Sequence, residues 1–324
     1  MVTITMRNKV NVLILGGSGF IGTNLVKKFV KKKNVKIIAT YFKNFPKINS
    51  KRIKWIKIDL RNFSNVLKIT KGIDILIQAA AITSGSKDVI NKPYIHVTDN
   101  VVMNAYLFKA AQINLIKHFI FLSCTTMYKS SQKIHNENTL IDQKNFIPQY
   151  FASATTKTFN EQICKFYSNL GITKYTVIRH SNVYGPYDKF DLEKSHFMGA
   201  TITKVLTAKK YVEVWGEGKE SRDFIFIDDL VDFIEKSISL QKNFYEIYNC
   251  GSDKVYKIND IVKKIISLSK KKIKIIYNKS KPNIPVNILI TSRKARKHLN
   301  WKPKTSIDEG IIKTINWWKK NINS

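Results

Sequence analysis

Apolar and polar positions alternate in blocks along the first half of the chain. Short apolar runs with the length of buried strands span residues 10–15, 36–40, 53–58, 73–78, 118–123 and 175–179. Segments with the spacing of amphipathic helices lie between several of these runs, at residues 20–33, 100–114 and 151–170. This rhythm predicts an α/β fold built on a doubly wound parallel sheet, with ligands at the carboxyl ends of the strands.

The rhythm breaks after residue 182. Glycine and proline mark loops at 185–186, 216–218 and 282–285, and helices are predicted at 198–208, 228–240 and 259–270. We therefore predict two lobes. Residues 1–180, with a return segment at about 224–252, form the dinucleotide-binding lobe, and residues 181–223 and 253–324 form a smaller, interleaved C-terminal lobe that binds the substrate.

A glycine-rich turn at residues 16–22 directly follows the first apolar run. Gly16 permits a tight turn, Gly19 lets the backbone approach a pyrophosphate, and Gly22 lets the next helix lie against the strand. Phe20 and Ile21 open that helix, whose free N–H groups and positive dipole end suit a pyrophosphate. This arrangement predicts a Rossmann-like dinucleotide site, and packing alone is the alternative reason for the glycines.

The end of the second predicted strand bears on the choice of cofactor. An NAD site usually has a carboxylate there for the ribose hydroxyls, whereas residues 39–43 contain none. Lys43 would instead favour a 2′-phosphate. The sequence therefore favours NADP over NAD.

The net charge of +33 raises the question of nucleic-acid binding. The lysines are scattered over nearly every predicted helix and loop, and the chain is rich in Ile and Asn as well as Lys. This distribution favours a generally basic surface that attracts anionic substrates, and no specific nucleic-acid partner is expected.

The cysteines are Cys124, Cys164 and Cys250, too few and too far apart for a disulfide framework or a metal site. Residues 1–9 lack the apolar core of a signal peptide, and no run approaches the length of a membrane span. We expect a cytoplasmic protein with no membrane partner.

Six segments together resemble the extended short-chain dehydrogenase/reductase family of nucleotide-sugar enzymes, over essentially the full length of the chain. They are the glycine turn and residues 58–60, 78–81, 222–230, 249–252 and 295–303. The resemblance implies that Lys157 contacts the nicotinamide ribose and that Asp59 meets the adenine, although Asp59 has a helix N-terminal charge as its alternative role. The other cofactor contacts that it implies are Leu60, Ala79, Ala80 and Asn182.

Within that family, residues 182–190, 195–196 and 214–222 resemble the GDP-L-fucose synthases. Those enzymes take GDP-4-keto-6-deoxy-mannose, invert two carbons beside the ketone and reduce the ketone with NADPH. The resemblance implies that His196 is the acid of the epimerisation, and a surface histidine is the alternative. It implies a substrate-binding set of Thr125, Asn182, His196, Lys204, Trp215 and Arg222. Arg222 suits bidentate phosphate contacts and Trp215 offers a ring face, unless it only packs.

The predicted catalytic set departs from the family pattern. It consists of Cys124, Thr126, Ser153, Lys157 and His196. Cys124 stands where the family has Ser or Thr, and Thr126 where the fucose synthases have cysteine. Ser153 stands four residues before Lys157, where the family has a tyrosine whose phenol is the general acid.

An alkyl hydroxyl is a far weaker acid than a phenol, and three explanations stay open. Ser153 holds a water that relays the proton, Tyr150 substitutes if the helix starts late or bends, or the site does not reduce ketones. Epimerisation does not require the phenol, since His196 with Cys124 or Thr126 can supply an acid and a base.

The sequence thus predicts an NADP-dependent nucleotide-sugar epimerase/4-ketoreductase that acts on a GDP-4-keto-6-deoxy-hexose. Alternatives are an epimerase or reductase of another nucleotide sugar, and a catalytically silent nucleotide-sugar-binding relative. A homodimer through residues 100–114 and 151–170 is expected by the same resemblance.

Overall fold

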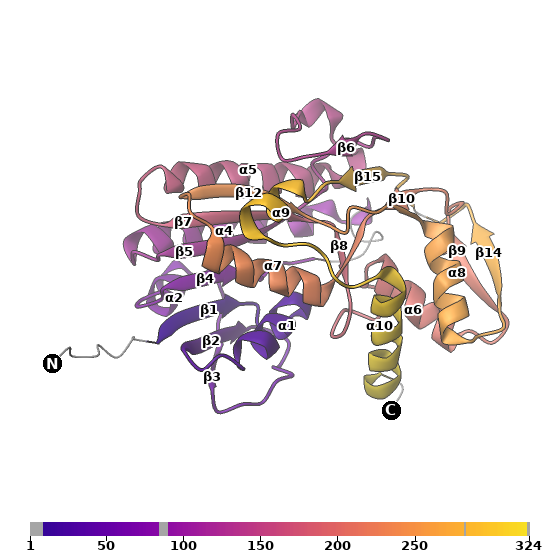
Figure 1. The fold of residues 1–324 in the computed structure, drawn as a ribbon, viewed down its shortest axis with the longest axis horizontal. Coiled ribbons are helices and arrows are strands. Elements are labelled where there is room, and N and C mark those ends of the chain that lie inside the picture. Colours follow the sequence, from indigo (N-terminus) through magenta and orange to yellow (C-terminus); the bar gives the residue numbers. More distant parts are fainter. Residues whose placement is uncertain (1–8, 84–89, 282, 323–324) are drawn as a thin grey trace.

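A seven-stranded parallel sheet in the order β12-β7-β5-β4-β1-β2-β3 forms the centre of the computed structural model (Figure 1), which describes residues 9–83, 90–281 and 283–322. Its strands are β1 (Val10–Leu15), β2 (Val35–Tyr41), β3 (Ile53–Lys57), β4 (Ile75–Gln78), β5 (His118–Cys124), β7 (Lys174–His180) and β12 (Tyr245–Cys250). The order runs outward in both directions from β1, so the crevice between the carboxyl ends of β1 and β4 is the topological switch point. The predicted doubly wound sheet is confirmed.

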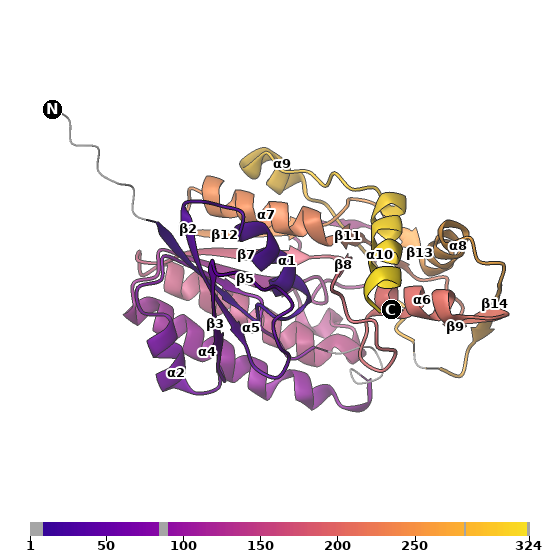
Figure 2. The ribbon, with the colours of Figure 1, turned by 90° about the horizontal axis from the view of Figure 1, so that it is seen from below.

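Helices cover both faces of this sheet (Figure 2). One layer contains α2 (Phe63–Ile69), α4 (Thr98–Ile113) and α5 (Phe151–Ser168), and the other contains α1 (Phe20–Phe29), α7 (Ile227–Leu240) and α9 (Arg293–Leu299). Alternate strand residues serve the two layers: Leu13 belongs to the apolar cluster on the α4 side, and Ile14 to the cluster on the α7 side. Burial on both faces explains why the strands read as unbroken apolar runs.

Several predicted boundaries differ from the observed ones by one to four residues, and two of them have a clear physical reason. The helix predicted to reach residue 33 ends at Phe29, because residues 30–34 turn back and the carbonyl of Asn34 accepts from the N–H of Val10 at 3.0 Å. The strand predicted from residue 73 begins at Ile75. Asp74 precedes it, and its carboxylate accepts from the N–H of Asn11 at 2.9 Å in place of a strand pairing.

The later elements extend beyond the carboxyl ends of the main sheet. β8 (Asn182–Tyr184) pairs with β11 (Phe224–Phe226), and β9 (Tyr211–Trp215) pairs with β14 (Lys274–Asn278). The helices there are α6 (Phe197–Thr207), α8 (Ile258–Ser269) and α10 (Ile307–Asn321) (Figure 1). The lobe boundaries given above stay a prediction.

A small four-stranded sheet and three short 3₁₀ helices complete the described structure. The sheet has the order β13 (Tyr256–Lys257), β10 (Ser221–Arg222), β15 (Asn287–Ile290) and β6 (Ile134–His135), and the 3₁₀ helices are η1 (Pro93–His96), η2 (Gln143–Asn145) and η3 (Pro148–Tyr150). None of the helices in the described part of the chain combines the length and apolar character that a membrane crossing needs.

Candidate active site

The turn between β1 and α1 is a cradle in which side chains do not fit. Gly16 has a φ of +68°, and a Cβ there would lie 2.7 Å from the Cα of Ala80 and 2.9 Å from the carbonyl oxygen of Ala79. A Cβ on Gly22 would lie 2.0 Å from the carbonyl oxygen of Gly16. The N–H of Gly19 donates to that same oxygen at 2.9 Å. Backbone contacts therefore require glycine at positions 16 and 22.

The open side of this cradle suits an anion. A Cβ on Gly19 would meet one atom within 4 Å, the Gly16 oxygen at 3.2 Å, so Gly19 faces open space on its other sides. Helix α1 begins at Phe20, followed by Ile21, with no side-chain cap and no acidic residue in its first turn. Its first N–H groups and dipole are therefore available to a pyrophosphate. The residues present fit a nicotinamide dinucleotide.

Charged residues gather beside the ends of β2 and β3, where the adenosine of such a cofactor would lie. Arg61, which sequence reasoning missed, pairs with Asp59 at 2.7 Å and with Asp99 at 3.1 Å, and its guanidinium lies 5.7 Å from the centroid of the Phe42 ring. The hydrogen bond from Arg61 lowers the pKa of Asp59. Lys43 is exposed and Leu60 is buried. The signal for Arg61 was its place two residues after Asp59.

Lys157, Cys124 and Thr126 gather around the carboxyl end of β5. The Lys157 ammonium donates to the carbonyl of Leu122 at 2.6 Å, and burial lowers the pKa of Lys157. The sulfur of Cys124 lies 3.0 Å from the Thr126 hydroxyl. Thr125 between them is buried. Three residues of the predicted catalytic set thus share one edge of the sheet.

Ser153 and Tyr150 lie at the start of α5. The Ser153 hydroxyl donates to the carbonyl of Tyr150 at 3.0 Å. Tyr150 closes η3 and precedes α5 as its N-cap, so the helix starts after it. The Tyr150 hydroxyl lies 3.4 Å from Nη1 of Arg222, on the segment that sequence reasoning assigned to the substrate. The structure therefore associates the Tyr150 phenol with Arg222.

Two histidines, His180 and His196, lie close enough to interact electrostatically, and His180 also interacts with Lys157. His196 is the N-cap of α6. His180, which sequence reasoning missed, ends β7 in register with Cys124 at the end of β5. Burial, together with the nearby positive charges of Lys157 and His196, lowers the pKa of His180 to about 4. The signal for His180 was its place at the end of a predicted strand.

The predicted substrate residues form two groups. The Lys204 ammonium lies 4.8 Å from the centroid of the Trp215 ring, and the Trp215 indole donates to the carboxylate of Glu213 at 2.9 Å. Arg222 donates from Nη2 to the carbonyl of Ile284 at 3.1 Å, while its buried Nε lacks a hydrogen-bond partner in the described part of the chain. The Asn182 amide donates to the carbonyl of Asp223 at 2.9 Å. Arg222 therefore keeps an unused donor.

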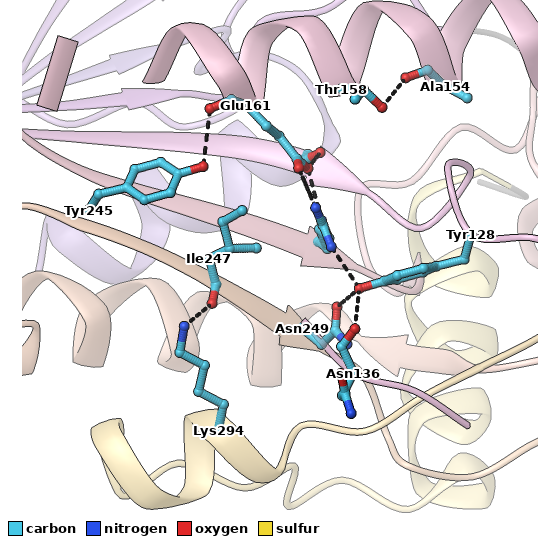
Figure 3. A network of polar contacts seen from close by, with 11 residues as sticks. Tyr128, Asn136, Ala154, Thr158, Glu161, Tyr245, Ile247, Asn249 and Lys294 are labelled. Carbon is cyan, nitrogen blue, oxygen red and sulfur yellow. Dashed lines mark hydrogen bonds and ion pairs between the residues drawn. The ribbon is translucent and has the colours of Figure 1, made fainter. Parts of the chain in front are cut away.

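A buried polar network adjoins the predicted catalytic residues Cys124, Thr126, Ser153 and Lys157, which we call the candidate reaction end (Figure 3). Arg179 on β7 pairs with Glu161 on α5 at 2.6 Å and donates to the Tyr128 hydroxyl at 2.9 Å. That hydroxyl donates to the amide oxygen of Asn249 on β12 at 2.8 Å, and the Ser123 hydroxyl donates to Glu161 at 2.5 Å. The network joins α5 to β5, β7 and β12 through Glu161, which lies one helical turn after Lys157. Sequence reasoning gave neither Glu161 nor Arg179 a functional role.

Comparison with known proteins agrees with this arrangement. A family profile described as the NAD dependent epimerase/dehydratase family matches residues 12–251. GDP-mannose 3,5-epimerase of Arabidopsis thaliana is 25% identical over 95% of this chain and 82% of its own length. GDP-L-colitose synthase of Yersinia pseudotuberculosis is 27% identical over 97% of this chain and 99% of its own length. UDP-glucuronate 4-epimerase of Thermodesulfobacterium geofontis is 29% identical over 96% of each chain.

Solved structures show the same fold. UDP-glucose 4-epimerase of Thermotoga maritima, solved with UDP-glucose, superposes with a TM-score of 0.86 at 21% identity and covers 97% of this chain and 100% of its own. UDP-glucuronic acid 4-epimerase of Bacillus cereus, solved with UDP-glucuronic acid and NAD, has a TM-score of 0.84 at 23% identity. The match covers 96% of this chain and 99% of its own. With its glycine cradle, its Lys157 on α5 hydrogen-bonded to β5, and this profile match, the chain belongs to the NAD dependent epimerase/dehydratase family.

Proposed function

We propose that this protein is a nucleotide-sugar epimerase and 4-ketoreductase that acts on a GDP-4-keto-6-deoxy-hexose with NADPH. The observation that carries the proposal is the gathering of Lys157, Cys124 and Thr126 at the edge of the sheet that also holds the glycine cradle. The names of two relatives, GDP-mannose 3,5-epimerase and GDP-L-colitose synthase, support a GDP-linked sugar.

In this proposal each part of the site has one task. The bound cofactor supplies the hydride. Lys157 orients the nicotinamide ribose, and His196 with Cys124 or Thr126 moves the protons beside the ketone. Lys204, Trp215 and Arg222 hold the nucleotide diphosphate, for which Nε of Arg222, without a hydrogen-bond partner among the described residues, is a suitable donor.

The test is to incubate the purified protein with GDP-4-keto-6-deoxy-mannose and NADPH in deuterated water. Cofactor oxidation and carbon-bound deuterium are followed together. We expect deuterium uptake together with NADPH consumption. Neither signal, at concentrations at which both ligands bind, would contradict the proposal.

A second candidate is an epimerase that performs no net reduction. The observation that favours it is Ser153, whose hydroxyl is engaged by the Tyr150 carbonyl where the family supplies a phenol. For this candidate the same experiment yields deuterium uptake without NADPH consumption.

The preference for NADP is also a proposal, because the profile and several solved relatives name NAD. Its support is the basic Lys43 and the absence of a carboxylate among residues 39–43, all of which the structure describes. Lys43→Ala should weaken NADP binding about three- to tenfold and leave NAD binding unchanged, as measured by calorimetry. Equal affinities in the unmodified protein would contradict it.

A homodimer through α4 and α5 is the last part of the proposal. The exposed Ile113 of α4 and the exposed Phe159 and Phe166 of α5 support it. Residues 159 and 166 are two helical turns apart and share a face of α5. Light scattering should report a dimer that Phe166→Glu converts to a monomer.

A further inference from the structure

His180 and Cys124 are neighbours across the sheet although 56 positions separate them in the chain numbering. They are register partners at the ends of the adjacent parallel strands β7 and β5. Adjacent strands lie about 4.8 Å apart, and register partners have their side chains on the same face. Both residues are partly exposed. His180 therefore borders the space in which Cys124 and Lys157 lie.

The hydrogen bond of His180 determines its tautomer. Nδ1 lies 2.8 Å from the carbonyl oxygen of Ser181, and because a carbonyl only accepts, Nδ1 carries the proton. Nε2 of the neutral ring then has a lone pair and no proton. Burial and the charges of Lys157 and His196 lower the pKa of this ring to about 4, so the ring stays neutral at physiological pH. Nε2 is therefore an acceptor only.

This acceptor has no partner among the residues that the structure describes. Across residues 9–83, 90–281 and 283–322, Nε2 makes no hydrogen bond within the chain. The nearest candidate donor by register is the Cys124 thiol, and its sulfur already contacts the Thr126 hydroxyl at 3.0 Å. A partly exposed acceptor at the ligand-binding edge of the sheet is thus available to a ligand.

We propose that Nε2 of His180 accepts a hydrogen bond from a hydroxyl group of the bound sugar, on a carbon near the reacting one. The inference rests on the proposed function, because it requires a nucleotide-linked sugar in this site. In the proposed function the reacting carbon lies beside Cys124 and Lys157. His180 lies on β7, the strand next to the β5 strand that carries Cys124. A ketone or a carboxylate at that position cannot donate, so His180 selects sugars that carry a free hydroxyl there.

The test measures binding and needs no turnover. Calorimetry with the NADP-loaded protein compares GDP with GDP-mannose for the unmodified protein, His180→Phe and His180→Gln. His180→Phe keeps a planar ring without the acceptor, and His180→Gln retains an acceptor oxygen. We expect His180→Phe to weaken GDP-mannose binding about three- to tenfold while GDP binding stays within twofold, and His180→Gln to recover part of the loss.

A second measurement starts with the unmodified protein, so its first step does not depend on how the variants fold. The 2-, 3-, 4- and 6-deoxy analogues of GDP-mannose are bound to the unmodified protein, and one of them should show a similar loss. That analogue should show no further loss with His180→Phe.

Three results would overturn the inference. In the first, GDP and GDP-mannose weaken equally with a folded His180→Phe, which assigns His180 a structural role. In the second, no deoxy analogue loses affinity. In the third, His180→Phe changes only the alkylation rate of Cys124, which assigns Nε2 to the thiol. If the unmodified protein binds neither GDP nor GDP-mannose, the proposed function fails together with this inference.

Discussion

The glycine cradle and the reaction end lie on the same edge of one sheet, yet they depend on different parts of the residues. The cradle is formed by backbone that tolerates no side chain at Gly16 and Gly22. The reaction end consists of side chains, and three of them, Cys124, Thr126 and Ser153, differ from the resembled family pattern. The comparison teaches that a site formed by backbone permits few residue types at its positions. The side chains that transfer protons can be replaced by other types while the backbone around them stays the same.

The frame beneath the reaction end explains how such changes are tolerated. The Glu161–Arg179 pair and the Tyr128 hydroxyl join α5 to β5, β7 and β12. These groups are almost fully buried. Lys157 keeps its place relative to β5 because the network holds the helix that carries it.

The largest expected effect is that of Gly22→Ala, which would break the cradle. The new Cβ would lie 2.0 Å from the backbone oxygen of Gly16, so the start of α1 must shift. We expect loss of dinucleotide binding by at least about a hundredfold, measured by calorimetry with NADP and NAD. Gly72→Ala is the control, since a Cβ at Gly72 meets nothing within 4 Å and costs only about 1 kcal/mol for its positive φ. Normal binding by Gly22→Ala would show that the cradle does not need backbone approach.

Next is the removal of the buried carboxylate with Glu161→Ala. It leaves the Arg179 charge uncompensated and should lower the free energy of unfolding by about 3–5 kcal/mol in denaturant titrations. The matched control is Glu309→Ala, which removes an exposed pair with Lys313 and should leave the free energy of unfolding nearly unchanged. A similar loss of unfolding free energy in the two variants would mean that the buried network does not stabilise the structure around the candidate reaction end.

Asp188, which lies before α6 in the chain, allows a test by pH. Burial raises the pKa of Asp188 from 3.8 to about 7. Between these values the folded protein binds more protons than the unfolded protein, so this group lowers stability as pH rises from about 4 to 7. Asp188→Asn should therefore raise the melting temperature by several degrees at pH 8 and change it little at pH 4, as measured by calorimetry. An equal change in melting temperature at both pH values would contradict a raised pKa of Asp188.

The smallest expected effect sharpens the comparison at the reaction end itself. Ser153→Tyr restores a phenol four residues before Lys157 and should raise the rate of ketone reduction at least about tenfold. Ser153→Phe, which adds the ring without the hydroxyl, is the control and should give no gain. The readout is NADPH oxidation with GDP-4-keto-6-deoxy-mannose. Equal rates for the two variants would indicate that the site transfers the proton by another route.

Much of the sheet and the cradle could be predicted from local sequence. The strand at Val10–Leu15 matches its predicted bounds, because a run buried on both faces needs only apolar residues that end at a turn. The short strands β9 and β14 were missed. They lie in a part of the chain where two- to five-residue strands leave no periodic signal. The positions of the predicted site residues relative to a ligand stay predictions.

The sequence by itself determined the parallel sheet, the glycine turn and the residue types at the reaction end, since these depend on spacing along the chain and on the size of a side chain. Only the tertiary structure decided which side chains meet. Strand register brings His180 beside Cys124, and the packing of loops and helices against the strands brings the Tyr150 hydroxyl beside Arg222 and the Tyr128 hydroxyl to Asn249. Such contacts join residues far apart in the chain, and local patterns carry no information about how separate strands align.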